Sequence, residues 1–438
     1  MNFASNASST AVTQVARTLL GLLLAVLLAR SLSEADRGMF AVVVTVALVA
    51  EQLSHLGMRI AVIYRVTRPG AARDRAVGAA LQWTLFGFAV VIAAALAGSG
   101  WLRERFMLGA EPVVLYLALA LAAADVFAQL ADAVARGIDR FDLRNWDQIS
   151  FAGVSLVAAF VALEILGQGL LGALVAIAVA RLAVMAVFGA LTLRASGLDL
   201  SADRTELRES LAVGVQGWFQ TLLGKLHERA DVVIMAALLL DPAQIAVYAV
   251  AVSVVDRLRV VPDSISVALL PQLASSSQAE AGPYTARVTR HVFFWVVLGS
   301  VLLALVAPAL MPLIFGAPYA ASVAPLLVLL PATVLLLLRT LPQNYFNATG
   351  NPAFIVRVQA VSLAVNVAAN LWAIPRFGVI GAAWASVLSY GVEAVACLWA
   401  FRRRTRCGLR ETLVLSADDL ASYRSGVRRL LSTSGGEP

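Results

Sequence analysis

Charged side chains are scarce in this sequence of 438 residues. They make up 14% of the chain, whereas about 25% is usual in a soluble domain. Hydrophobic residues make up 60%, against roughly 45–50% in a soluble domain. So few polar side chains could not cover the apolar surface of a water-soluble fold, and lipid is the solvent that fits. The composition therefore excludes a cytosolic enzyme, a secreted domain and a disordered chain.

Cysteine and lysine are also rare. The two cysteines, Cys397 and Cys407, have no paired spacing, so we expect neither a disulfide framework nor a zinc site. One Lys and 33 Arg give a net charge of +7, which by itself could suggest a nucleic-acid partner. Most of these residues, however, lie in short gaps between apolar runs or in the last 37 residues. That distribution indicates membrane topology, so we expect no nucleic-acid partner.

Catalytic and nucleotide-binding motifs are missing from the sequence. Gly224-Lys225-Leu226 lacks the spacing and the hydroxyl group of a phosphate-binding loop. His227-Glu228 begins like a zinc-peptidase helix, but Asp231 stands where the second histidine is needed. We therefore expect no cofactor, no metal and no enzymatic activity.

The apolar residues form runs of the length that crosses a membrane, about 20 residues. We count twelve such runs, at 8–30, 38–64, 77–98, 112–135, 148–166, 171–193, 211–240, 245–270, 291–315, 323–345, 358–374 and 380–401. The sequence therefore predicts an all-α polytopic membrane protein with twelve transmembrane helices.

The gaps between the runs differ sharply in basic residues. When the gaps are assigned alternately to the two sides of the membrane, 21 basic residues fall on one side and 5 on the other. Basic residues accumulate on the cytoplasmic side of membrane proteins. This predicts a multi-pass membrane protein with both termini in the cytoplasm.

The two halves of the sequence repeat weakly. A shift of 208 residues places Leu32, Ala35, Ala41 and Val42 on identical residues, and a shift of 209 places Gly169 to Ala173 on Gly378 to Ala382. The repeat predicts two pseudo-symmetric six-helix bundles around a central cleft. We expect an N-terminal lobe over 1–200, a C-terminal lobe over 201–401 and a basic cytoplasmic tail over 402–438. The tail contains a weakly amphipathic helix candidate around 413–431.

Charges inside the apolar runs are the informative feature, because each costs roughly 2.5–3.5 kcal/mol at the centre of a membrane helix. Such side chains are expected to face a cavity or a partner. The candidate substrate-binding cations are Arg17, Arg59, Arg181, Lys225, Arg229, Arg259 and Arg339. The candidate coupling acids are Glu51, Asp125, Glu228, Asp231, Asp256 and Asp263.

Several of these charges share a helical stripe. Glu51, His55 and Arg59 are spaced i, i+4, i+8, and a second stripe runs from Asp125 through Gln129 and Asp132 to Arg136. Internal salt bridges that lock helices together are an equally good reading of such stripes. Arg17 is different, since its own run carries no acid and the shift of 208 places it on Lys225. Cations at matching depth in two lobes would suit an anionic ligand.

Three segments resemble the bacterial oligosaccharide-lipid flippases of the multidrug/oligosaccharidyl-lipid/polysaccharide exporter superfamily. The first is the hairpin from Leu28 to Phe40. The others are the unit of Glu228-Arg229-Ala230-Asp231 with Tyr248 and Leu270-Pro271, and the stretches from Ala348 to Pro352 and from Phe377 to Ser386. The likeness covers roughly residues 8–401.

The resemblance implies alternating access by two helical bundles. The cargo would be an oligosaccharide linked to undecaprenyl pyrophosphate, moved from the cytoplasmic to the outer leaflet during polysaccharide biosynthesis. A basic residue on the first helix matters in the related peptidoglycan-precursor flippases, and Arg17 occupies a comparable place. That group usually has more helices than the twelve counted here, which favours an exopolysaccharide or lipopolysaccharide carrier. The implied partners are membrane lipids, H⁺ or Na⁺, and polysaccharide polymerase or assembly proteins.

Two other functions remain open. A cation-coupled multidrug exporter of the same fold would need an acidic cleft, and the charges inside the runs are nearly balanced, with eight basic and nine acidic residues. A membrane polymerase or ligase would need a long outward loop, and no outward gap is long enough. A purely structural membrane protein is disfavoured by the number of buried charges.

Overall fold

The computed structural model describes residues 3–66, 73–196, 204–238, 241–416 and 419. Every regular element in these ranges is helical, as predicted for an all-α protein. The elements are α1 (Phe3–Ser31), α2 (Glu34–Ser54), α3 (Met58–Val66), α4 (Arg73–Ala97), α5 (Ser99–Phe106), α6 (Pro112–Gly137), α7 (Phe141–Phe160), η1 (Val161–Ile165), α8 (Gly169–Ser196), α9 (Arg204–Ala237), α10 (Pro242–Leu258), α11 (Val260–Ser275), α12 (Gln278–Phe315), η2 (Ala317–Ser322), α13 (Val323–Ala348), α14 (Pro352–Thr405) and α15 (Leu409–Leu413).

Nine helical stretches among the described residues are long and apolar enough to cross a membrane. The protein is therefore a multi-pass membrane protein. The nine stretches do not include α9, α10 or α11. They also count α14 as one stretch, although the sequence predicts two spans in it. The number of twelve spans stays a prediction.

The long helix α14 turns back on itself at Gly378. This glycine has φ 56° and ψ −137°, a conformation that residues with a Cβ rarely adopt. Ser362 Oγ donates to the carbonyl oxygen of Ser389 at 2.7 Å, although 27 residues separate them. The stretches before and after Gly378 are thus antiparallel neighbours, and the break falls in the gap predicted between the last two runs.

The run at 38–64 is interrupted by a turn between α2 and α3. Leu56 and Gly57 have positive φ, and the amide of Gly57 donates to Nδ1 of His55 at 3.2 Å. The prediction that Glu51, His55 and Arg59 form one continuous stripe is therefore wrong, because the helix does not continue through this turn.

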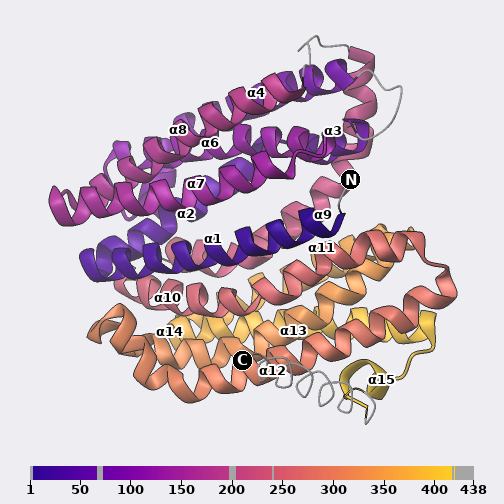
Figure 1. Ribbon diagram of the computed structural model, residues 1–438. Coiled ribbons are helices and arrows are strands. Elements are labelled where there is room, and N and C mark those ends of the chain that lie inside the picture. The colour runs from indigo at the N-terminus through magenta and orange to yellow at the C-terminus, as the bar shows by residue number, and fades with distance from the viewer. Residues whose placement is uncertain (1–2, 67–72, 197–203, 239–240, 417–418, 420–438) are drawn as a thin grey trace, which may run out of the picture.

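The helices lie roughly parallel in two groups (Figure 1). We call helices α1 to α8 the N-terminal bundle and helices α9 to α14 the C-terminal bundle. The repeated glycines occupy matching turns, since Gly169 has φ 58° and Gly378 has φ 56°. The other repeated hairpin also matches, with Ser33 capping α2 and Asp241 capping α10. The boundary predicted between residues 200 and 201 lies outside the described residues.

The two bundles touch closely at the helix ends remote from the start of α1. At Gly38 an added Cβ would lie 1.8 Å from the carbonyl oxygen of Pro242, so α2 and α10 meet backbone to backbone. Nearby, the guanidinium group of Arg30 donates to the last carbonyl oxygens of α12, at 2.6 Å to Leu313 and 2.8 Å to Ile314. A cation at a helix C-terminus is favourable. These contacts close one side of the molecule. On the other side α9 reaches the N-terminal bundle closely, since an added Cβ at Gly57 would lie 2.2 Å from the carbonyl oxygen of Gly214.

At the opposite side, the chain after α14 packs back on the C-terminal bundle. The carboxylate of Asp419 lies 2.8 Å from Arg290 and 3.4 Å from His291. Hydrogen bonds from Ser416, with these two side chains nearby, lower the pKa of Asp419 to about 2. The contact is therefore stabilising above the ordinary pKa of about 3.9 and is lost as the pH falls towards 2. Most of the helix predicted at 413–431 lies outside the described residues.

The close approach at Gly38 gives a stability prediction. Gly38→Ala must push α2 away from α10, and overpacking of this kind costs about 1–3 kcal/mol. Gly189→Ala in α8 is the matched control, because nothing lies within 4 Å of its added Cβ. A helical glycine replaced by alanine without a clash gains up to about 1 kcal/mol. Thermal unfolding of the purified protein should therefore shift down for the first variant only. Equal melting temperatures for the two variants would contradict the backbone contact.

Candidate functional site

A cavity of about 650 Å³ lies between the two bundles. Helices α1, α3, α6, α7 and α8 line it from the N-terminal bundle, and α9, α10 and α11 line it from the C-terminal bundle. Its charged lining residues are Arg17, Arg59, Arg136, Arg144, Arg181, Lys225, Arg229, Arg257, Arg259, Asp125, Asp132, Asp147, Glu228, Asp256 and Asp263. Nine of these are basic and six are acidic, so the cavity carries a net positive charge.

Arg17 and Arg257 enter the cavity from opposite bundles and have no hydrogen-bonding or ion-pair partner among the described residues. The guanidinium group of Arg257 lies against Gly21, where an added Cβ would be 3.5 Å from Nη2. Gly21 stands about one helical turn after Arg17 on α1. Two guanidinium groups that could bind an anion therefore reach the same part of the cavity from opposite bundles.

Several other cations of the cavity are paired with carboxylates. Arg181 lies 2.5 Å from Asp125 and 2.9 Å from Asp147, and its guanidinium group stacks 4.6 Å from the ring of Phe151. Asp132 similarly holds two arginines, Arg136 at 2.7 Å and Arg144 at 3.1 Å. These pairs fix the lining helices α6, α7 and α8 to one another.

The C-terminal side of the cavity shows the same pairing. Glu228 lies 2.7 Å from Arg259 and 3.0 Å from Lys225, and Asp256 lies 3.5 Å from Arg259. Lys225 lines the cavity as predicted, but it has a partner and Arg257 does not. The prediction that Lys225 acts together with Arg17 stays a prediction, and Arg257 is a second candidate that has no partner among the described residues.

Gln129 connects Arg59 and Glu51, two charged residues that the sequence spacing predicts on one helical stripe. Its amide accepts a hydrogen bond from Arg59 at 3.2 Å and donates one to the carboxylate of Glu51. Glu51 is buried behind the cavity wall and also accepts from Gln52 at 2.9 Å. Arg59 thus faces the cavity with only a neutral partner, whereas Glu51 does not line the cavity.

Two charged residues of the cavity remain free besides Arg17 and Arg257. Arg229 and Asp263 both line the cavity, and the described residues offer neither of them a hydrogen bond or an ion pair. Asp263 is exposed, and its charge acts on Arg17. The unpartnered groups are therefore three arginines and one aspartate, which again leaves an excess of positive charge.

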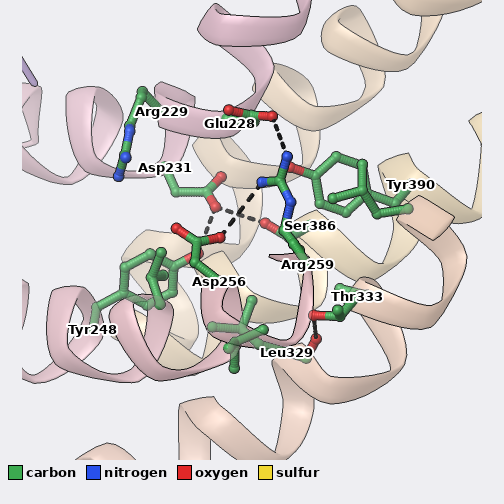
Figure 2. A pocket seen from close by; sticks show the side chains of 14 residues that line it. Glu228, Arg229, Asp231, Tyr248, Asp256, Arg259, Leu329, Thr333, Ser386 and Tyr390 are labelled. Atoms are coloured by element: carbon green, nitrogen blue, oxygen red, sulfur yellow. Dashed lines mark hydrogen bonds and ion pairs between the residues drawn. The ribbon is translucent and has the colours of Figure 1, made fainter. Parts of the chain in front are cut away.

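A smaller pocket of about 50 Å³ lies inside the C-terminal bundle (Figure 2). Asp231 is buried beside it and accepts hydrogen bonds from Tyr248 at 2.5 Å, Ser386 at 2.6 Å and Asn370 at 2.8 Å. Four residues line both this pocket and the large cavity, namely Glu228, Arg229, Asp256 and Arg259. The predicted coupling residue Asp231 therefore lies one layer of side chains behind the cavity.

Arg339 is the one predicted binding residue that the structure removes from the site. It is buried between α13 and α14, where its guanidinium group donates to Glu393 at 3.1 Å. The other oxygen of Glu393 lies 3.7 Å from His227, and neither Arg339 nor Glu393 lines the cavity. The expectation that Arg339 binds substrate is wrong for this conformation, because a buried carboxylate holds it inside the bundle.

Two lining residues lie near the start of α7, upstream of the predicted apolar run. That run begins at 148, whereas α7 begins at Phe141. Arg144, Asp147, Gln148, Phe151 and Ser155 all line the cavity. Their spacing is that of one helical stripe, so extending the periodicity upstream of 148 would have found Arg144 and Asp147. Arg257 lies inside a predicted apolar run, but no sequence pattern indicates that its side chain lacks an ion-pair partner.

Groups of three or more metal-binding side chains are absent from the part of the chain that the structure describes. The polar lining is instead made of arginines, carboxylates, amides and hydroxyl groups. This donor set suits an anionic, hydroxyl-rich ligand better than a metal ion.

Comparison with protein families identifies the chain. The family model described as polysaccharide biosynthesis protein matches residues 3–277, which is more than half of the sequence. The chain belongs to this family. The match includes α1 to α11 and therefore both walls of the cavity. No curated protein matches the chain.

Several solved transporter structures share the fold. An inward-facing multidrug resistance transporter of the MATE family has a TM-score of 0.71 at 17% identity, over 90% of this chain and 98% of that one. The lipid II flippase MurJ in an inward closed conformation has a TM-score of 0.72 at 12% identity, over 90% and 89%. The Vibrio cholerae MATE transporter VcmN in the bent form has a TM-score of 0.56 at 14% identity, over 92% and 98%. The predicted resemblance in fold to these transporters is confirmed.

The buried pair of Arg339 and Glu393 gives a test that separates structural charges from cavity charges. Glu393→Ala leaves a guanidinium group unpaired inside the bundle, which costs about 3–5 kcal/mol. Arg17→Ala removes a cation without a partner and should leave the melting temperature nearly unchanged. Thermal unfolding in detergent measures both.

A double variant, Arg339→Met with Glu393→Met, guards against a general packing defect. Removing both charges should recover most of the stability lost in Glu393→Ala, because the penalty arises from the unpaired cation. If Arg17→Ala proved as destabilising as Glu393→Ala, the distinction between the two classes of charge would be wrong.

Proposed function

We propose that this protein moves an oligosaccharide linked to undecaprenyl pyrophosphate from the cytoplasmic to the outer leaflet of the bacterial inner membrane, during polysaccharide biosynthesis. The protein would act as a transporter and not as an enzyme. Family membership supports a role in polysaccharide biosynthesis. The shared fold with the flippase MurJ supports translocation of a lipid-linked cargo.

The observation that carries the proposal is the convergence of Arg17 and Arg257. Each is a planar donor without a protein partner, and they come from opposite bundles into one cavity. A pyrophosphate bears two adjacent negative groups, and two guanidinium groups can each form paired hydrogen bonds to one of them. An anion held between the bundles would also favour the conformation that brings them together.

The rest of the lining suits the sugar. Gln14, Gln129 and Gln148 offer amide groups, and Ser155 offers a hydroxyl group. The prenyl tail would stay in the bilayer, since burying an uninterrupted hydrocarbon chain among these charges would be unfavourable. The cargo would thus divide between a wet cavity for its head and lipid for its tail.

Alternating access would separate the bundles where they now touch. In the described state, the contact of Gly38 with Pro242 and that of Arg30 with the end of α12 close the side away from the cavity. Rocking of the bundles would break these contacts and open the side that they now close. The orientation proposed from the basic residues puts both termini, and the side on which the cavity lies, in the cytoplasm.

Coupling to H⁺ or Na⁺ is the proposed energy source, because the sequence has no phosphate-binding loop. Asp231 is the best placed of the coupling candidates. It is a buried carboxylate surrounded by hydroxyl and amide donors, and Glu228, Asp256 and Arg259 connect its pocket to the cavity. Polysaccharide polymerase or assembly proteins would use the product on the outer side.

A cation-coupled multidrug exporter remains the second candidate. The similarity in fold to MATE transporters favours it. The charge of the cavity argues against it, since an organic cation would meet nine basic and six acidic side chains. Three unpartnered arginines would repel such a ligand.

Deletion of the gene gives the direct test of the cargo. We expect the lipid-linked oligosaccharide to accumulate in the cytoplasmic leaflet, as measured by a leaflet-specific accessibility assay. Arg17→Ala and Arg257→Ala should each fail to complement the deletion at normal protein level. The loss of one charged hydrogen bond costs about 1.5–3 kcal/mol, so transport should fall by about tenfold or more.

Arg194→Ala is the matched control, since Arg194 is exposed at the end of α8 and does not line the cavity. It removes the same charge and should complement fully. An unchanged leaflet distribution in the deletion strain would falsify the proposed cargo. Full rescue by both Arg17→Ala and Arg257→Ala would remove the anion site from the mechanism.

A binding measurement distinguishes the two candidate functions. Undecaprenyl pyrophosphate should raise the melting temperature of the purified protein, and tetraphenylphosphonium should not. A ligand at 100 times its Kd stabilises the folded state by about 2.7 kcal/mol. Arg17→Ala should abolish the shift. Stabilisation by the organic cation alone would favour the multidrug exporter.

A further inference from the structure

An apolar groove of about 670 Å³ lies on the outer surface of the C-terminal bundle, far from the charges of the cavity. Its walls come from Leu335 on α13 and from the second half of α14. The α14 residues that line it are Val387, Leu388, Gly391, Val392, Val395, Ala396 and Trp399. None of these residues lines the large cavity, so the groove is a separate feature.

The groove is a notch made by small side chains between large ones. Gly391 and Ala396 leave space along α14, while Leu388, Val395 and Trp399 project beside it and are 54%, 68% and 55% exposed. An added Cβ at Gly391 would touch only Leu335, at 3.8 Å. From Val387 to Trp399 the helix rises roughly 18 Å. That is close to the depth of one leaflet, about half of a 30 Å hydrocarbon core.

One end of the groove carries a positive charge. The guanidinium group of Arg403 lies 4.0 Å from the centre of the Trp399 ring. Arg403 is exposed, and no carboxylate pairs with it among the described residues. Tryptophan and arginine are typical of the boundary between hydrocarbon and headgroups. The groove therefore runs from this boundary into the hydrocarbon of one leaflet.

We propose that this groove binds one acyl chain of an anionic glycerophospholipid, with its phosphate group on Arg403. The chain would fill the notch at Gly391, and the headgroup would meet the arginine held over Trp399. The position of the charge selects the headgroup, since a zwitterionic lipid would offer Arg403 a phosphate offset by its own cation. Arg402 and Arg406, which are also exposed, add to the attraction.

Other occupants fit less well. The prenyl tail of the cargo would have to enter a groove that shares no lining residue with the cavity holding Arg17 and Arg257. A second copy of the chain would need a broad complementary surface rather than a notch about one chain wide. The lipid site is independent of the proposed cargo, because no residue of the cavity takes part in it.

The chain contains a matched control for the charged end of the groove. On the first half of α14, Arg376 lies 4.9 Å from the ring of Trp372 and donates to its carbonyl oxygen at 2.7 Å. The spacing of the two residues is the same as that of Trp399 and Arg403, but neither residue of this pair lines the groove. Arg376→Gln therefore removes the same charge from the same kind of pair without touching the site.

Native mass spectrometry of the full-length protein, released from detergent with added lipid, tests the proposal. The probes are phosphatidylglycerol and phosphatidylcholine with identical acyl chains. We expect the wild type to retain phosphatidylglycerol about fivefold better, the effect of about one basic residue at a membrane surface. Arg403→Gln should remove most of this preference, and Arg376→Gln should keep it.

A second variant tests the apolar part of the site. Gly391→Leu fills the notch and should reduce retention of both lipids, while a normal melting temperature in lipid-free detergent shows that the bundle is intact. Equal preference in Arg403→Gln and the wild type, or equal loss in Arg403→Gln and Arg376→Gln, would overturn the proposal. Displacement of phosphatidylglycerol by undecaprenyl phosphate at equal concentration would instead assign the groove to the cargo tail. Arg17→Ala should bind phosphatidylglycerol normally, so this result is separable from failure of the proposed transport.

Discussion

The cost of placing a charge in hydrocarbon governs this structure. Each charged side chain within a membrane-spanning helix must find a partner or face water, because the bilayer offers neither. The chain uses both solutions. Arg339 is paired with Glu393 inside the C-terminal bundle, and Arg181 is held by two aspartates at the cavity wall. Arg17 and Arg257 are left without partners, and both lie where the cavity provides water.

This division separates charges that build the protein from charges that are available to a ligand. The network of Arg181 with Asp125 and Asp147 ties α8 to α6 and α7 and shapes the cavity. It offers little further attraction to an anion, since its charge is already compensated. The free arginines keep their full set of donors. Specificity for the proposed anionic cargo would therefore depend on which arginines lack a partner, and the net charge of the sequence does not reveal this.

Much of the fold could be predicted from the sequence, because spans and turns have local signals. The apolar runs, the glycine hairpins at Gly169 and Gly378 and the repeat all depend on residues close together in the chain. Pairing depends on residues far apart. Arg339 and Arg257 both look like isolated cations in apolar runs, and only the fold places Glu393 beside the first and Gly21 beside the second. The break at Gly57 was missed because a glycine inside a helical pattern is usually tolerated.

The cost of burying an unpaired charge also affects the proposed separation of the two bundles. Arg37 is buried at the closed contact between the bundles, and its neighbour Gly38 touches Pro242. The guanidinium group of Arg37 lies 5.5 Å from the ring of Phe40, and no carboxylate pairs with it among the described residues. A buried cation without a carboxylate destabilises the state that buries it. Separation of α2 from α10 would return Arg37 to water and offset part of the energy lost with the interbundle contacts. Close backbone packing therefore stabilises the closed side, and the buried charge of Arg37 destabilises it. Two opposing effects of this kind would keep the two states of the proposed transport cycle close in free energy.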